Sequence, residues 1–179
     1  MSLVDLIPLS AEERTPHISP LSLPWLMSRP PDAGKAGESS NAVSIEAPSL
    51  KGMRVVVVED EAITQMQLRM ILTRAGLQVV GTAVNGQQGV DIVRITQPDL
   101  ILMDIKMATD QDGLDAARTI LSEGPACVIM VSAYEEYKEE SEQLGASGYV
   151  VKPIDSTTLA PQLAQAYHRF RQKHPDIVQ

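Results

Sequence analysis

The chain has 179 residues, of which 44% are hydrophobic, so it is long enough for one domain with a packed core and a shorter additional segment. Its formal net charge is -8 and its Lys and Arg residues are scattered, which argues against direct binding to nucleic acid. The single cysteine, Cys127, excludes an internal disulfide, and no apolar run is long enough to span a membrane.

The first fifty residues differ in composition from the rest of the chain. They hold seven of the 12 prolines and many serines, and no helical or alternating apolar pattern persists among them. Such a segment buries too little apolar surface to offset the entropy lost on ordering. We therefore predict a flexible extension over residues 1–50. Its start carries Asp5 and lacks the features of a signal peptide, so we expect a cytoplasmic protein.

From residue 53 onward, short apolar runs alternate with segments of helical periodicity. The runs are mostly β-branched and lack an in/out alternation, which is typical of strands covered on both faces. They lie at residues 55–58, 77–81, 100–103, 126–131 and 148–151. The helical faces are clearest in the first helix (Leu68, Ile71, Leu72, Ala75) and in the last (Leu159, Leu163, Ala166, Tyr167, Phe170).

Turn and cap residues separate these segments. Gly76 follows the first helix, Asn85-Gly86 opens the second, and Asp155 or Ser156 is the expected cap of the last. The alternation predicts an α/β fold with a doubly wound sheet, in which five strands alternate with five helices through right-handed crossovers. We expect this domain to occupy residues 51–174 and to be followed by a short tail, 175–179.

Polar residues follow four of the five apolar runs. They are Glu59, Asp60 and Glu61 after the first, Asp104 after the third, Ser132 after the fourth and Lys152 after the fifth. In open parallel sheets, ligands bind beyond the carboxyl ends of the strands. Taken singly, each of these residues fits a helix cap, a turn or a surface charge. Taken together, the carboxylates would repel one another by roughly 3 kcal/mol at about 5 Å, for an effective dielectric constant near 20.

A carboxylate cluster of this kind requires a cation, and Mg²⁺ is the natural candidate because it prefers oxygen ligands. A carboxylate can also act as a nucleophile toward phosphorus. Mg²⁺ and a lysine ammonium would then neutralise charge on the transferring phosphoryl group, and a serine hydroxyl would donate a hydrogen bond to it. The sequence thus predicts a phosphoryl-transfer site at this edge of the sheet.

The same residues resemble the receiver domain of two-component response regulators, over residues 53–172. The matching pieces are Val57-Val58-Glu59-Asp60-Glu61, Leu102-Met103-Asp104, Asp112-Gly113-Leu114, Val131-Ser132-Ala133 and Gly145-Ala146-Ser147-Gly148-Tyr149-Val150-Val151-Lys152-Pro153. Each piece is weak alone, whereas their order and spacing are specific. The resemblance implies a flavodoxin-like (βα)5 fold, a three-layer sandwich with parallel strand order 2-1-3-4-5.

The resemblance also implies a phosphoacceptor and a metal site. Asp104 corresponds to the residue that accepts the phosphoryl group. Glu59, Asp60, Asp104 and the backbone carbonyl of Lys106 correspond to the ligands of Mg²⁺. A protein of this kind is a signalling receiver rather than an enzyme, and its only chemistry is Mg²⁺-dependent self-phosphorylation and autodephosphorylation.

Other residues at the same edge correspond to the switch of the family. Ser132 resembles the switch hydroxyl, Lys152 the phosphate-binding lysine and Tyr149 the aromatic residue that turns inward when the hydroxyl moves toward phosphate. Lys106 and Tyr134 occupy positions that influence autodephosphorylation in the family, although exposed surface residues would also fit there.

Two local features accompany the resemblance. The Lys152–Pro153 peptide bond corresponds to one that is usually cis in the family. The loop after Asp104 lacks the proline found in many receivers and reaches Asp112-Gly113 one residue later, as in a subgroup with a longer loop.

Two other interpretations use the same residues. A phosphatase of the haloacid dehalogenase type also uses an Asp nucleophile and Mg²⁺, but it carries an Asp-x-Asp motif after its first strand, where this chain has Glu59-Asp60-Glu61. A pseudo-receiver is an interaction module that is never phosphorylated. Such modules usually lose the acceptor, an acidic ligand or the lysine, and this chain keeps all three.

The helix expected after Ser132 is acidic and has a thin apolar face made of Tyr134, Tyr137 and Leu144. It is therefore either a solvated helix or an element that shifts on phosphorylation. One helix remains after Lys152-Pro153, so we expect a stand-alone receiver. Its expected partners are a histidine kinase or histidine phosphotransfer protein and a downstream effector protein. The effector, or a second copy of the chain, would bind the face made of the acidic helix, the fifth strand and the last helix.

Overall fold

The computed structural model describes residues 49–107 and 112–177. The predicted extension up to residue 48, the centre of the atypical loop at 108–111 and the last two residues lie outside the described part. Within it, the chain forms five β-strands, five α-helices and one short 3-10 helix. None of the described helices is long and apolar enough to cross a membrane.

The strands form one parallel sheet in the order β2-β1-β3-β4-β5. Their bounds are β1 Arg54–Val58, β2 Gln78–Ala83, β3 Leu100–Asp104, β4 Val128–Ser132 and β5 Gly148–Val151. The predicted fold class and strand order are therefore confirmed. All residues of β3 and β4 are buried, because helices cover both faces of the sheet. This double burial explains why these strands show no alternation of apolar and polar residues.

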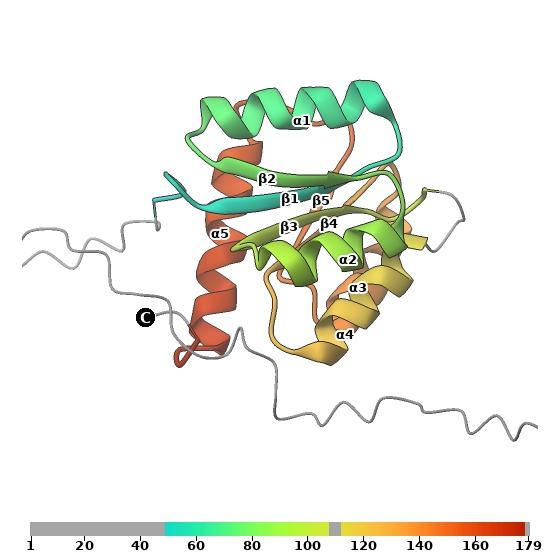
Figure 1. Cartoon of the computed structure of the whole chain (residues 1–179), viewed down its shortest axis with the longest axis vertical. Helices are drawn as coiled ribbons and strands as arrows, with labels where there is room; N and C mark the ends of the chain where they lie inside the picture. The colour runs from blue at the N-terminus through green and yellow to red at the C-terminus, as the bar shows by residue number, and fades with distance from the viewer. Residues whose placement is uncertain (1–48, 108–111, 178–179) are drawn as a thin grey trace, which may run out of the picture. The chain divides into compact units, whose positions relative to one another are not determined.

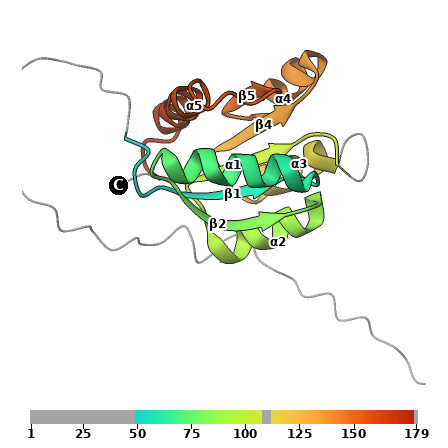
Figure 2. The same cartoon turned by 90° about the horizontal axis from the view of Figure 1, so that it is seen from above.

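The helices are α1 Ala62–Arg74, α2 Gly86–Thr96, α3 Asp112–Glu123, α4 Lys138–Leu144 and α5 Leu159–Lys173, with the 3-10 helix η2 Glu135–Tyr137 directly before α4. One apolar cluster joins α1 and α5 to the sheet, and a second joins α2, α3 and α4 to its other face. Figure 1 shows α1 on one side of the sheet and α2 and α3 on the opposite side. In Figure 2 the strands run from β2 at one edge to β5, beside α5, at the other.

The predicted helical faces are the ones that pack on the sheet. In α1, Leu68, Ile71 and Leu72 are buried, and all five predicted residues of α5 are buried. Burial of a Leu, Ile or Phe side chain contributes about 1.5–3 kcal/mol. The packing of these faces fixes both helices against the sheet and so places the loops at its carboxyl edge.

The first and third strands agree with the predicted runs to within one residue at each end, and larger differences occur in the second strand, the fourth strand and the last helix. The fourth strand starts at Val128 rather than at residue 126, because the N–H of Val128 donates to the carbonyl of Ala126 and closes a tight turn there. The second strand runs from 78 to 83 rather than from 77 to 81. The prediction of Asp155 or Ser156 as the cap of the last helix is wrong. Asp155 Oδ1 accepts a hydrogen bond from the N–H of Thr157 (2.6 Å) and closes a turn, so that α5 begins only at Leu159.

Asn85 does cap α2, as its position suggested. Its side-chain oxygen accepts a hydrogen bond from the N–H of Gln88 at 2.9 Å. The Lys152–Pro153 peptide bond is cis, as the resemblance implied.

Candidate functional site

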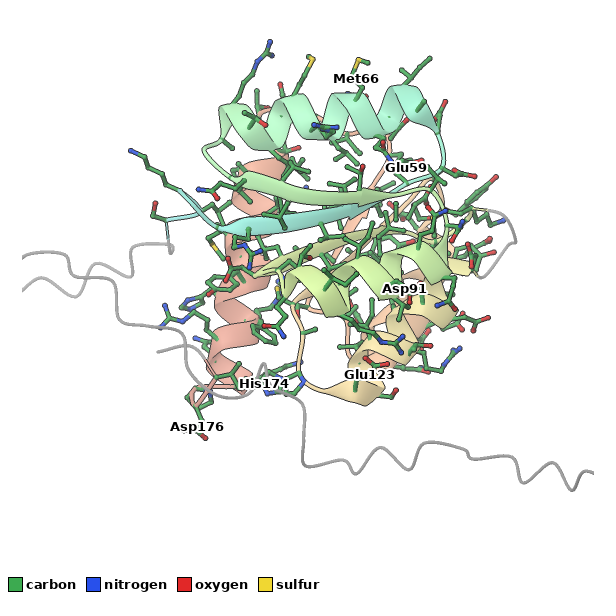
Figure 3. The ribbon with its side chains drawn as sticks, viewed as in Figure 1. Glu59, Met66, Asp91, Glu123, His174 and Asp176 are labelled. Atoms are coloured by element: carbon green, nitrogen blue, oxygen red, sulfur yellow. The ribbon has the colours of Figure 1, made fainter. Side chains whose placement is uncertain are left out.

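Three carboxylates meet at the carboxyl ends of β1 and β3. These strands are neighbours with Val58 opposite Met103, so the next residues, Glu59 and Asp104, lie at the same level. One oxygen each from Glu59, Asp60 and Asp104 lies within 4.8 Å of the others. Glu59 is 1% exposed and Asp104 is 5% exposed, whereas Asp60 faces solvent. In Figure 3, Glu59 is labelled at this end of the sheet, near the start of α1.

The ammonium group of Lys152 is in contact with two of these carboxylates. Lys152 follows β5, and its Nζ lies 2.8 Å from Glu59 Oε2 and 2.8 Å from Asp104 Oδ2. Burial lowers the pKa of Lys152, but its contacts with the carboxylates of Asp104 and Glu59 outweigh this effect and hold the pKa above its ordinary value. The ammonium pairs with two of the three carboxylates, so negative charge exceeds positive charge among these four side chains.

The two oxygens of the Glu59 carboxyl group have different partners. Its Oε1 accepts a hydrogen bond from the N–H of Glu61 at 3.2 Å. Its Oε2 is buried and touches Lys152 as an ion pair, yet it receives no hydrogen bond of good geometry from the described residues. Burial raises the pKa of Glu59, which opposes and outweighs the effect of Lys152. A buried carboxylate that shares one ammonium with a second acid, inside a cluster of three carboxylates, fits a hard divalent cation with oxygen ligands.

Ser132 and Tyr149 come from the adjacent strands β4 and β5. Ser132 ends β4, is 1% exposed and accepts a hydrogen bond from the N–H of Tyr134 at 3.1 Å. Tyr149 packs against the apolar cluster on the side of α3 and α4, and its hydroxyl donates to the backbone carbonyl of Tyr134. Burial raises the pKa of Tyr149. Both side chains therefore hold the backbone of the loop after β4.

Lys106 connects the loop after β3 with the segment before α4. Its N–H lies 3.4 Å from Asp104 Oδ1, and its Nζ lies 4.4 Å from the centre of the Tyr134 ring and 5.3 Å from that of Tyr137. Such cation–π contacts contribute about 0.5–1 kcal/mol at exposed sites. The structure thus gathers all the predicted site residues at one edge of the sheet.

Three residues near the acids have positions that the sequence did not indicate. Gln65 donates from its side-chain amide to the carbonyls of Glu59 and Ala83. Asp112 Oδ2 accepts a hydrogen bond from the N–H of Gly86 at 2.8 Å, which joins the starts of α3 and α2. A Cβ atom on Gly113 would lie 1.8 Å from the carbonyl oxygen of Asp104. The Asp-Gly pair is recognisable in the sequence as part of a motif, but its contacts are not, and Gln65 carries no distinguishing signal.

Comparison with known proteins places the chain in a family. Residues 55–166 match the model of the response regulator receiver domain. The chain is 37% identical over 121 residues to the transcriptional regulatory protein PdtaR of Mycobacterium tuberculosis. The aligned residues cover 66% of this chain and 58% of that protein. The match thus spans little more than half of that regulator. Over 115 residues it is 35% identical to the chemotaxis protein CheY of Thermotoga maritima, with 63% of this chain and 95% of that protein covered.

Solved structures give the same result. The response regulator domain of Thermotoga maritima CheB superposes with a TM-score of 0.58 at 31% identity, covering 68% of this chain and 98% of that one. The receiver domain of the PhyR response regulator from Erythrobacter litoralis superposes with a TM-score of 0.60 at 29% identity, covering 68% of this chain and 94% of that one.

Proposed function

This chain belongs to the response regulator receiver family, and on that premise we propose that it is the phosphoacceptor of a two-component phosphorelay, with Asp104 as the residue that takes the phosphoryl group. The observation that carries the proposal is the contact of one ammonium, that of Lys152, with both Asp104 and Glu59 inside a cluster of three carboxylates. A nucleophilic carboxylate, a phosphate-binding cation and a pair of acidic metal ligands are the parts that phosphoryl transfer to aspartate needs.

Glu59, Asp60, Asp104 and the backbone carbonyl of Lys106 are the proposed ligands of Mg²⁺. The buried Oε2 of Glu59, which receives no hydrogen bond of good geometry from the described residues, supports this assignment. When bound, Mg²⁺ supplies positive charge that offsets the repulsion among the acids and the charge of the phosphoryl oxygens.

The chain's own side chains then have separate tasks in the transfer. A carboxylate oxygen of Asp104 attacks phosphorus, and the bond between phosphorus and the donor's histidine nitrogen breaks, with the electron pair returning to the imidazole. The ammonium of Lys152 lies 2.8 Å from Asp104 Oδ2. It is therefore close enough to transfer its contact from this carboxylate to the oxygens of the incoming phosphoryl group. Ser132 Oγ accepts a hydrogen bond from the N–H of Tyr134, and its hydroxyl would donate its own hydrogen to a phosphoryl oxygen.

Lys106, Tyr134 and Tyr149 are proposed to control the lifetime and the structural effect of the phosphorylated state. Lys106 and Tyr134 lie against each other beside the acceptor, where they would limit the access of water to the acyl phosphate. The hydroxyl of Tyr149 is hydrogen-bonded to the carbonyl of Tyr134, whose N–H is hydrogen-bonded to Ser132. A movement of Ser132 toward phosphate would therefore be transmitted to both tyrosines.

The α4-β5-α5 face is the proposed output surface. In η2 and α4 only Ser141 is buried, so few contacts hold this segment in place. On β5, Val151 is 39% exposed and is available to a partner. We expect a downstream effector or a second copy of the chain to bind here, and a histidine kinase or histidine phosphotransfer protein to be the phosphoryl donor. Residues 51–174 are the proposed receiver domain, and a cytoplasmic location is part of the same proposal.

The direct test uses a small-molecule phosphodonor in the presence of Mg²⁺. We expect one phosphoryl group per chain, removed by hydroxylamine as an acyl phosphate, and no labelling of the Asp104→Asn variant. Asp115→Asn is the matched control, because Asp115 is an exposed acid on α3 whose carboxylate pairs with Arg118 and takes no part in the acidic cluster. If the wild type stays unlabelled, the result favours the interpretation as a pseudo-receiver. Many turnovers of a phosphomonoester per chain would instead indicate a phosphatase of the haloacid dehalogenase type.

A further inference from the structure

We propose that Gln65, in the first turn of α1, is a positioning residue that fixes the backbone of the two neighbouring acids, Glu59 and Asp60, for binding of a divalent cation. This inference rests on the proposed function, because it concerns acids that we assign as ligands of Mg²⁺. Gln65 itself would not touch the cation. It would act through the backbone of Glu59.

The side-chain amide of Gln65 joins the ends of two strands. Its Nε2 donates to the carbonyl of Glu59 at 3.1 Å and to the carbonyl of Ala83 at 3.2 Å. The same carbonyl of Ala83 also accepts a hydrogen bond from the N–H of Glu59 at 3.0 Å. Because an amide nitrogen carries two hydrogens, one side chain can serve both carbonyls. Glu59 is thereby tied at its N–H and at its carbonyl, immediately beyond the last residue of β1.

Gln65 is well placed for this task because its own backbone is anchored. Its N–H donates to the carbonyl of Glu61 at 2.9 Å, the bond with which α1 begins. The side chain then reaches back over the short loop from Glu59 to Glu61 and is partly buried there. The three-residue loop that carries the acids is therefore held between the end of β1 and the helix by one glutamine.

A tether is needed at this point because the acids repel each other. Glu59 is 1% exposed, and one of its carboxylate oxygens lies within 4.8 Å of oxygens from Asp60 and Asp104. A loop without a tether would relax to separate the charges, and the cation would have to restore the arrangement when it binds. Groups that orient the ligands of a metal typically change its affinity by tenfold or more when they are removed.

The same helix offers a matched control. Gln67 lies two residues further along α1, and its Nε2 donates to the carbonyl of Ile154 at 3.2 Å, on the loop after β5. Gln67 has the same side-chain amide as Gln65 and lies in the same helix. Its hydrogen bond goes to a different loop from the one that carries the acids. Gln65→Met and Gln67→Met each remove one amide while keeping an unbranched side chain of similar length.

The experiment is a calorimetric titration of the full chain with Mg²⁺, using wild type, Gln65→Met and Gln67→Met. We expect the dissociation constant to rise about tenfold in Gln65→Met and to stay within about twofold of wild type in Gln67→Met. We also expect the labelling rate of Gln65→Met to fall at low Mg²⁺ and to recover at saturating Mg²⁺. An equal shift in both variants, or wild-type affinity in a folded Gln65→Met protein, would overturn the proposal.

Two further arms keep the outcomes separable. If Gln65→Met does not fold, Gln65→Asn, whose amide is one methylene shorter, replaces it with the same expected direction. If the wild type binds Mg²⁺ but Asp104 is not labelled, the proposed function fails while the tether is still tested by affinity. A wild type that binds no divalent cation overturns both.

Discussion

At the scale of single residues, Lys152 provides the positive charge that two buried acids of the site contact. Its Nζ lies 2.8 Å from both Glu59 and Asp104, two acids that are almost fully buried. Removing one partner of a buried ion pair leaves a carboxylate uncompensated, at a cost of several kcal/mol. The lysine therefore matters for stability as well as for the chemistry proposed for it.

We predict that Lys152→Met lowers the free energy of unfolding by about 2–4 kcal/mol in the absence of divalent ions. Mg²⁺ should recover more stability in this variant than in wild type, because the acids of the variant have no ammonium to compensate their charge. Urea unfolding with and without Mg²⁺ measures both effects, and Lys138→Met, on the exposed start of α4, is the control. A variant as stable as wild type, or one that responds no more strongly to Mg²⁺, would contradict the assigned contacts.

Glu59 gives the site a dependence on pH. Burial raises its pKa, so the folded chain binds this proton more tightly than the unfolded chain does. Stability is therefore lost as the pH rises through the window from the ordinary value of 4.5 to the raised value in the fold.

We predict that Glu59→Gln loses this contribution, so that its melting temperature falls less than that of wild type as the pH rises through the same window without Mg²⁺. Thermal melts of both proteins over a pH series provide the measurement. Parallel curves for the two proteins would show that the carboxyl group of Glu59 titrates in the fold as it does in the unfolded chain.

At the scale of elements, the start of α3 lies directly against the end of β3. Gly113 lies so close to β3 that an added Cβ would be 1.8 Å from the carbonyl oxygen of Asp104 and 2.8 Å from the Cα of Ile105. Its N–H also donates to the carbonyl of Ile105 at 3.0 Å. The helix and the residue proposed as phosphoacceptor therefore cannot keep this contact if a side chain is added.

We predict that Gly113→Ala destabilises the fold by about 3 kcal/mol, because the clash is with backbone that has little room to move. Gly145→Ala is the comparison. Gly145 has a φ of +101° but open space around its Cβ, so only the strain of a left-handed backbone, about 1 kcal/mol, is expected. Chemical denaturation of the two variants should rank them in this order, and the reverse order would exclude a tight contact at Gly113.

The segment formed by η2 and α4 is the element expected to move most easily. It buries a single residue, Ser141, whereas α3 buries five. We predict that backbone amides in Lys138–Leu144 exchange with deuterium faster than those in Asp112–Glu123, by at least about tenfold. Equal protection of the two helices in an exchange experiment would argue against α4 as the mobile part of the output face.

At the scale of the whole molecule, the sequence predicted more of the arrangement than of its details. Five mostly apolar strands, recognisable because they carry no alternation of apolar and polar residues, fix the edge at which Glu59, Asp104, Ser132 and Lys152 meet. The side chains that fix the geometry of that edge could not be predicted in the same way. Gln65 acts on carbonyls of two strands, and the error at Asp155 arose because a local turn competes with helix capping.

The central claim is that Asp104 is the residue that becomes phosphorylated. The most direct measurement is to treat the full chain with a phosphodonor and Mg²⁺, reduce the product with borohydride, which converts an aspartyl phosphate to homoserine, and locate the change by peptide mass spectrometry. We predict conversion at position 104 only, and none when the phosphodonor or Mg²⁺ is omitted. Conversion at Asp60 or at another acid, or the absence of conversion in a folded protein, would contradict the claim.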